Sequence, residues 1–193
     1  MTQSELVAGM VFLSLVVACE LLFLLALARQ VGRLYMRLPP VGARALQAGP
    51  ELGEAIGPVA IDDLRAVRLI VGGPHDEATL AVFTAPGCRA CVELIPALRT
   101  LAGEPGLQVH VLSLSADPVE NQQFQTKLAD ARVRVAAAQG LAKEFNITLT
   151  PYAIVLDRHG TVVGKGATSS LEHLESLIAL LDRPIEELAA SNG

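Results

Sequence analysis

The pattern of apolar and polar residues divides the chain into an apolar N-terminal stretch, an irregular middle and an alternating C-terminal part. Leu6–Ala28 contains 23 residues and one ionisable carboxylate, that of Glu20. A helix of this length, at about 1.5 Å rise per residue, spans the roughly 30 Å hydrocarbon core of a bilayer. A cleaved signal peptide would begin with basic residues and carry a shorter apolar run. The stretch therefore predicts a single transmembrane anchor.

Two residues inside this stretch need an explanation of their own. The sequence VVAC at residues 16–19 resembles a lipoprotein cleavage box, but the apolar run continues past Cys19 to Leu27 and no basic residue precedes it. Glu20 is costly in hydrocarbon unless it is protonated or paired. A protonated carboxyl near one end of a tilted helix and a contact with a partner helix are the two explanations for Glu20.

The middle of the chain lacks sustained periodicity. It begins with PPVG at residues 39–42 and stays rich in Gly, Pro and Ala up to Pro58, which is typical of a linker. The chain is therefore expected to consist of an anchor with its basic flank, a linker, a folded domain and a C-terminal tail, at residues 1–37, 38–66, 67–185 and 186–193.

Within the folded domain, strand-like and helix-like patterns alternate. Short apolar runs predict buried strands, and Pro118 after the cap residue Asp117 predicts the start of a helix. The predicted strands are Val67–Val71, Thr79–Phe83, Leu107–Leu114, Arg132–Ala136, Tyr152–Asp157 and Thr161–Lys165, and the predicted helices are Cys91–Leu101, Pro118–Ala129, Leu141–Phe145 and Ser169–Leu181. From Thr79–Phe83 onward, the order β-α-β-α-β-α-β-β-α predicts an α/β sandwich with a mixed sheet whose last hairpin is antiparallel.

Composition and charge narrow the class of function. The chain is 51% hydrophobic and 18% charged, which departs from soluble averages in the direction of a membrane protein. After Ala45 there are 11 Lys and Arg and 18 Asp and Glu, a net charge of −7. An acidic domain without a basic stripe is not expected to bind nucleic acid.

The motif that carries chemistry is FTAPGCRAC, residues 83–91, where a buried strand ends and a helix begins. Two residues between Cys88 and Cys91 let both sulfurs meet across the first helical turn. Unpaired N–H groups and the helix dipole favour a thiolate at Cys88, and Arg89 adds a cation. A cysteine of lowered pKa is both a nucleophile and a good leaving group, as thiol–disulfide exchange requires.

Other uses of the cysteine pair have less support. A structural zinc site needs four ligands, and the sequence contains neither a second CxxC nor a histidine pair with ligand spacing. No metal and no cofactor are therefore expected beyond a redox-active disulfide between Cys88 and Cys91. An inert structural disulfide stays an alternative.

A second feature is Thr150-Pro151, directly before a predicted strand. A proline in this position is expected at a turn or in a cis peptide bond. With this dipeptide the sequence resembles the thioredoxin superfamily over about residues 67–181. Residues 83–91 are similar to its strand–CxxC motif, Pro96 to its helix-kinking proline and Thr150-Pro151 to its cis-proline dipeptide. The resemblance implies a three-layer α/β/α sandwich in which Cys88 attacks and Cys91 resolves.

The layout also resembles one branch of that superfamily. The extra helix at residues 118–129 is similar to the insertion of the membrane-tethered periplasmic (TlpA/ResA-like) branch. Residues 27–32 and 49–53 resemble the MauD family of methylamine utilisation accessory proteins. This resemblance implies maturation of a periplasmic client of the methylamine dehydrogenase light-subunit type. It also implies redox-tuning or substrate-binding roles for a set of residues around the two motifs, namely Pro86, Gly87, Arg89, Ala90, Thr150 and Pro151.

Three departures from the superfamily pattern leave the direction of electron flow open. Arg89 stands where Pro or Gly is common, and Gly87 stands where an aromatic residue is usual. The buried carboxylate of reducing thioredoxins would fall at Val82, which cannot relay protons. Oxidant, isomerase and specialised reductant all stay possible roles. A thiol peroxidase is disfavoured because Ala85 stands where such relatives carry Thr. A non-catalytic membrane-tethered assembly factor is the alternative from another class.

The compartment is the point on which the indications disagree. The resemblance places the domain in the periplasm, where disulfides persist, tethered by one helix to the inner membrane. The expected partners are a protein substrate with thiols or disulfides and the membrane, with room for a membrane redox partner. The positive-inside rule instead predicts a cytoplasmic domain, because four basic residues follow the apolar stretch and none precedes it: Arg29, Arg33, Arg37 and Arg44.

Overall fold

The computed structural model describes residues 10, 12–13, 15–22 and 48–182, which belong to two units divided after Arg44. In the first unit the described residues are helical, and their large apolar side chains are between 38% and 70% exposed. Among the described residues, no helix combines the length and the apolarity needed to cross a membrane. The expected anchor at Leu6–Ala28 lies partly outside the described residues. Its basic flank, residues 38–47 of the linker and the tail at 186–193 lie wholly outside them.

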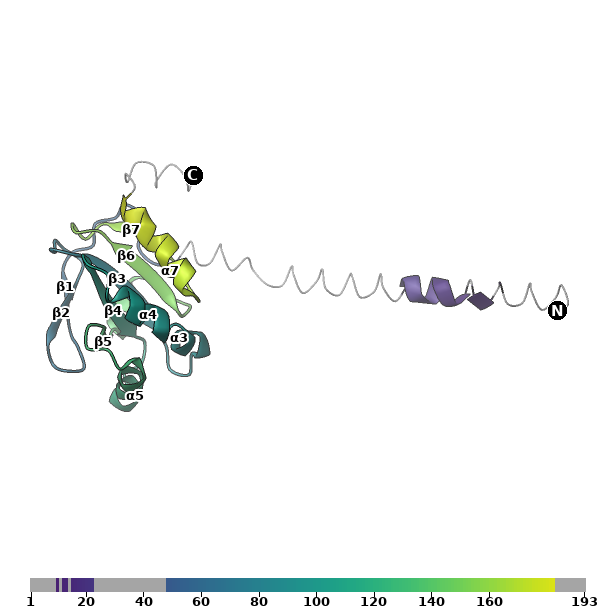
Figure 1. Cartoon of the computed structure of the whole chain (residues 1–193), viewed down its shortest axis with the longest axis horizontal. Helices are drawn as coiled ribbons and strands as arrows, with labels where there is room; N and C mark the ends of the chain where they lie inside the picture. Colours follow the sequence, from purple (N-terminus) through teal and green to yellow (C-terminus); the bar gives the residue numbers. More distant parts are fainter. Residues whose placement is uncertain (1–9, 11, 14, 23–47, 183–193) are drawn as a thin grey trace. The chain divides into compact units, whose positions relative to one another are not determined.

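A five-stranded mixed sheet forms the centre of the second unit (Figure 1), with the strand order β5-β4-β3-β6-β7. The strands β3 (Ala78–Thr84), β4 (Leu107–Ser113) and β5 (Arg134–Ala137) are parallel. The strand β6 (Tyr152–Leu156) runs antiparallel to both β3 and β7 (Val162–Ala167). The predicted mixed sheet with a final antiparallel hairpin is therefore confirmed.

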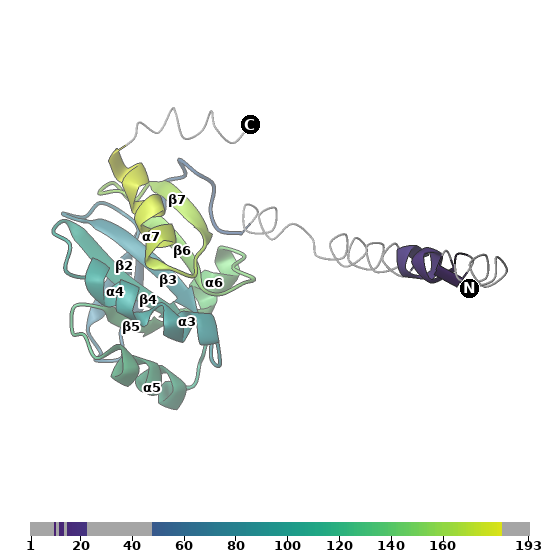
Figure 2. The ribbon, with the colours of Figure 1, turned by 45° about the vertical axis from the view of Figure 1, so that its right-hand side comes forward.

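Three helices cover one face of this sheet, namely α3 (Arg89–Glu93), α4 (Ile95–Leu101) and α7 (Leu171–Ile178). Figures 1 and 2 show α4 and α7 lying across the strands. Buried apolar residues of α4, α7 and β3 belong to one core cluster there. The sequence predicted one helix at Cys91–Leu101, and the structure has two. Proline in the first turn of α4 lacks an N–H, so it cannot continue the hydrogen bonding of α3.

The opposite face is covered by α6 (Gln139–Glu144) and by a hairpin of β1 (Val59–Asp62) and β2 (Arg68–Val71). A second core cluster lies between these elements and the sheet. Together the two faces give the expected three-layer architecture. The strand β1 was not predicted, because its alternating half-exposed residues follow a Gly- and Pro-rich stretch.

The stretch from Ala48 to Pro58, which the sequence assigned to the linker, packs against the sheet. The N–H of Gly53 donates a 2.8 Å hydrogen bond to the carbonyl oxygen of Val162. The buried Tyr152 hydroxyl donates to the carbonyl oxygen of Ala48 at 2.5 Å. These contacts join residues 48–58 to the folded unit.

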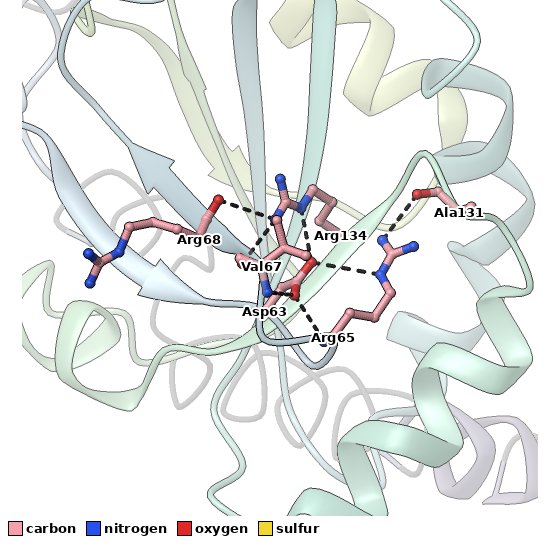
Figure 3. Close-up of polar contacts among 6 residues, drawn as sticks. All are labelled: Asp63, Arg65, Val67, Arg68, Ala131 and Arg134. Atoms are coloured by element: carbon pink, nitrogen blue, oxygen red, sulfur yellow. Dashed lines mark hydrogen bonds and ion pairs between the residues drawn. The ribbon is translucent and has the colours of Figure 1, made fainter.

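A buried carboxylate fixes the β1–β2 hairpin to β5 (Figure 3). Arg134 donates from Nε to Asp63 at 3.0 Å, and from Nη2 to the carbonyl oxygens of Val67 at 3.0 Å and Arg68 at 3.2 Å. Burial alone raises the pKa of Asp63, but hydrogen bonds from the N–H groups of Val67 and Arg65 and from Arg134 bring that pKa below its usual value. The hairpin is thus held by a charged, fully hydrogen-bonded link.

Candidate active site

The two cysteines lie where the wholly buried strand β3 ends and α3 begins. Gly87 has a φ of +68°, a left-handed conformation that glycine adopts without strain, and the chain turns there into the helix. Cys88 is the N-cap of α3 and is joined to Cys91 by a disulfide. The backbone N–H of Cys91 donates a 3.1 Å hydrogen bond to Sγ of Cys88. Cys88 is partly exposed, whereas Cys91 is 0% exposed.

Arg89 follows Cys88 directly, and its side chain is 91% exposed. Its Nε donates a 2.8 Å hydrogen bond to the carboxylate of Glu93, four residues later on the same short helix. This ion pair offsets part of the positive charge that the sequence expected beside the cysteines. Ala90 is half-buried in the same turn.

The Thr150-Pro151 dipeptide lies at the same end of the sheet as the cysteine motif. Tyr152 faces Phe83 in the β3–β6 ladder, so Pro151 directly precedes the residue that pairs with the first residue of the cysteine motif. The Thr150–Pro151 peptide bond is cis, as one of the two sequence-based alternatives predicted. The buried Pro151 accepts a 3.1 Å hydrogen bond from the N–H of Thr168 through its carbonyl oxygen.

A cavity of about 310 Å³ opens beside Cys88. Three segments line it: residues 84–89 with Val92, the end of β4, and α5 (Pro118–Leu128). Figures 1 and 2 show α5 at the β5 edge of the sheet, where it contacts α4 and β5. Pro86, Gly87 and Arg89 from the predicted site residues line this cavity, while Ala90, Thr150 and Pro151 do not.

Side chains that the sequence analysis did not single out fix the wall opposite the cysteines. Ser115 donates from Oγ to the carboxylate of Glu120 at 2.6 Å, and accepts at the same atom from the N–H of Asp117 at 3.0 Å. The buried Asn121 donates from Nδ2 to the carbonyl oxygen of Ser115 at 3.0 Å. The position of Ser115 in the sequence could have indicated this. The carboxyl ends of parallel strands lie at one edge of a sheet, and Ser115 follows β4 as the cysteines follow β3.

The charged groups of the cavity are few. Among the described residues that line it, Glu120 carries the one carboxylate, while Arg89 and Lys127 carry positive charges. Val82 is 0% exposed in the core, so no carboxylate lies at the position that the superfamily resemblance would give it. Within the described part of the chain, no cluster of three His, Cys, Asp or Glu side chains is arranged to hold a metal ion.

Comparison with known sequences decides the family. A model described as a thioredoxin-like domain matches residues 68–181. Methylamine utilization protein MauD of Methylorubrum extorquens is 37% identical over 92% of this chain and 87% of the relative. MauD of Paracoccus denitrificans is 34% identical over 91% of this chain and 88% of the relative. The chain belongs to the MauD family of thioredoxin-like proteins.

Solved structures agree with this MauD family assignment at the level of the fold. A thioredoxin-like protein from Aeropyrum pernix has a TM-score of 0.55 at 19% identity, covering 63% of this chain and 88% of that one. A secreted Mycobacterium tuberculosis disulfide oxidoreductase has a TM-score of 0.53 at 18% identity, covering 63% and 94%. The thioredoxin-like MauD family and the CxxC pair at the start of α3 make this protein a thiol–disulfide oxidoreductase.

Proposed function

We propose that this protein exchanges disulfides with a protein client, with Cys88 as the attacking sulfur and Cys91 as the resolving one. The observation that carries the proposal is the unequal exposure of the pair. Cys88 is partly exposed and lines the cavity, so a client sulfur can approach it. Cys91 is 0% exposed, so it reaches only Cys88.

The exchange balances in two steps. In the reducing direction, the Cys88 thiolate attacks one sulfur of a client disulfide. A Cys88–client disulfide forms, and the other client sulfur leaves as a thiolate and takes up a proton. The Cys91 sulfur then loses its proton and attacks Cys88, which releases the second client thiol and closes the Cys88–Cys91 disulfide. Two electrons pass to the client, and the same steps in reverse oxidise a client dithiol.

The local structure favours the thiolate form of Cys88. The N–H of Cys91 points its hydrogen at Sγ of Cys88, and such a donor stabilises a thiolate more than a thiol. A thiolate at this atom is the nucleophile in the reducing direction and the leaving group in the oxidising one.

We also propose that the client is a periplasmic protein of methylamine metabolism, of the methylamine dehydrogenase light-subunit type. The relatives that support this are named methylamine utilization proteins. In this proposal, residues 1–37 anchor the chain in the inner membrane and residues 38–47 connect. The expected connection at 48–66 belongs to the folded unit, so residues 48–185 act, and residues 186–193 form a tail. The apolar run at 6–28 and the exposed apolar side chains of the described residues in it support the anchor.

The side of the membrane is tested by a reporter fused to the C-terminus that is active only in the periplasm or only in the cytoplasm. Because disulfides persist in the periplasm, activity of the periplasmic reporter is the expected result. Activity of the cytoplasmic reporter alone, as the four flanking arginines predict, would contradict this part of the proposal.

The exchange activity is tested by the reduction of a disulfide-bonded protein with the reduced enzyme. Replacing Cys88 with Ser removes the attacking sulfur and is expected to abolish the reaction. Cys19→Ser is the matched control, because Cys19 is the free cysteine of the N-terminal unit, and it is expected to keep the full rate. Unchanged exchange by Cys88→Ser would refute Cys88 as the attacking sulfur. Absence of exchange by the unmodified protein would instead favour a non-catalytic assembly factor.

A further inference from the structure

One face of α5 forms a wall of the cavity that contains Cys88. The cavity-lining residues of this helix recur at positions i, i+3, i+4 and i+7, which places them on one side. They are Glu120, Gln123, Phe124 and Lys127, together with Asn121. A client group that enters this cavity therefore lies between the cysteine helix and this face of α5.

The wall is fastened at both ends. At the C-terminal end of α5, Arg99 donates from Nε to the carbonyl oxygen of Leu128 at 2.5 Å and from Nη2 to that of Lys127 at 2.7 Å. At the other end, Ser115 holds the carboxylate of Glu120, and Asn121 holds the carbonyl oxygen of Ser115. A wall fixed in this way loses little conformational freedom when a client binds.

The charged side chains along the cavity differ in whether they already form an ion pair or a hydrogen bond. Arg89 is paired with Glu93, and the carboxylate of Glu120 accepts from Ser115. Lys127 makes no ion pair with another described residue, and its side chain lines the cavity. The part of the chain after Ala45 has a net charge of −7, so an exposed, unpaired cation on the wall of this cavity is a local exception.

We propose that this cavity receives the client residue next to the attacked cysteine and that Lys127 selects a carboxylate there. The proposal rests on the disulfide exchange proposed above. Val92 and Phe124 supply apolar contact for the methylene groups of such a side chain, and the ammonium group of Lys127 meets its carboxylate. The preferred client segment is therefore one with Glu beside its cysteine.

The test uses the full-length protein and two peptides, each closed by one disulfide. The peptides are identical except for Glu or Lys beside the attacked cysteine, and their uncatalysed reaction with dithiothreitol corrects for intrinsic reactivity. The reduced protein is expected to reduce the Glu peptide about tenfold faster at low salt. The preference is expected to shrink in 0.5 M NaCl because exposed charges are screened.

Two variants separate a local effect of Lys127 from the charge of the whole domain. Lys127→Glu is expected to remove or invert the preference. Arg158→Glu changes the net charge equally but alters an exposed residue in the β6–β7 turn, at the opposite end of the sheet from Cys88, and is expected to keep the preference. Equal rates for the two peptides, or equal effects of the two variants, would overturn the proposal.

A neutral small disulfide, hydroxyethyl disulfide, distinguishes this failure from that of the proposed function. Reduction of it that depends on Cys88, without any peptide preference, would refute the docking role of Lys127 and leave the exchange function standing. Absence of Cys88-dependent reduction of all three substrates would instead refute the exchange function itself.

Discussion

Arg134 on β5 donates a 3.0 Å hydrogen bond from its guanidinium to Asp63, 71 residues earlier in the chain. The Asp63 carboxylate is 1% exposed, and the same oxygen forms an ion pair with Arg65 at 3.8 Å. This contact joins the β1–β2 hairpin to the edge of the sheet (Figure 3). The hairpin covers part of the second core cluster, so the contact supports the part of this layer that the hairpin forms.

Removal of the buried carboxylate is expected to destabilise the protein. Asp63→Ala leaves the Arg134 guanidinium without its anion and two backbone N–H groups without an acceptor, at a cost of about 3 kcal/mol in the free energy of unfolding. Urea denaturation measures this. Asp62→Ala is the control, because the side chain of Asp62 is 67% exposed, and a change within about 0.5 kcal/mol is expected. Equal losses in both variants would contradict the role of Asp63.

The free energy of unfolding is expected to decrease as the pH is lowered, because of His110. This residue of β4 is 2% exposed, and neither ring nitrogen has a hydrogen-bond partner among the described residues. Burial, and then the nearby Arg134 guanidinium, lower the pKa of His110 to about 4, from 6.5 in the unfolded chain. The folded state thus disfavours the protonated ring. The contribution of the neutral ring to the free energy of unfolding is complete above pH 6.5 and is lost as the pH falls from 6.5 to 4.

The size of this loss is about 3 kcal/mol over the full interval. The free energy of unfolding of the wild type, measured in urea at pH 7 and pH 5, is expected to decrease toward acid pH. His110→Gln is expected to show a smaller decrease, while the exposed His159→Gln is expected to follow the wild type. An unchanged pH dependence in His110→Gln would show that another group is responsible.

The fastening of α5 is tested by Arg99→Ala. This change removes two hydrogen bonds to carbonyl groups at the end of the helix, which is expected to cost about 1 to 2 kcal/mol. Amide hydrogen exchange is expected to speed up in residues 118–128 more than in α7, which lies outside this network. Uniform acceleration across both helices would mean that Arg99 acts only on global stability.

Two glycines with positive φ are expected to respond differently to replacement by alanine. At Gly87 no atom lies within 4 Å of an added Cβ, so only backbone strain of about 1 kcal/mol is expected. At Gly160 the added Cβ would lie 2.5 Å from the backbone nitrogen of Gly73, so the chain must also shift. Thermal unfolding is expected to show a clearly larger loss for Gly160→Ala. Similar losses would contradict this steric difference.

The sequence predicted the elements whose signals are local. Continuous apolar runs located β3 and β4, and Pro118 after Asp117 located the start of α5. The cysteine pair and the Thr150-Pro151 dipeptide were recognisable because each motif consists of residues that are close together in the sequence. The cis peptide bond then confirmed one of the two alternatives for Pro151.

The features that sequence patterns did not predict depend on contacts between distant segments. β1 is formed by pairing with β2 and is fixed through Asp63 to a residue of β5, so its short, half-exposed sequence carries little signal alone. The cavity beside Cys88 requires α5 to lie against α4 through Arg99. Neither the partner of Asp63 nor the face of α5 that lines the cavity follows from spacing along the chain.

The most direct test of the account is to trap the client on one cysteine. With Cys19 replaced by Ser in both proteins, reduced Cys91→Ser and reduced Cys88→Ser are each mixed with a disulfide-bonded protein client. Mass spectrometry then identifies the linked peptides. The account predicts a stable mixed disulfide at Cys88 in Cys91→Ser, and little or none at the buried Cys91 in Cys88→Ser. A mixed disulfide that forms mainly at Cys91 would contradict the assignment of Cys88 as the attacking sulfur.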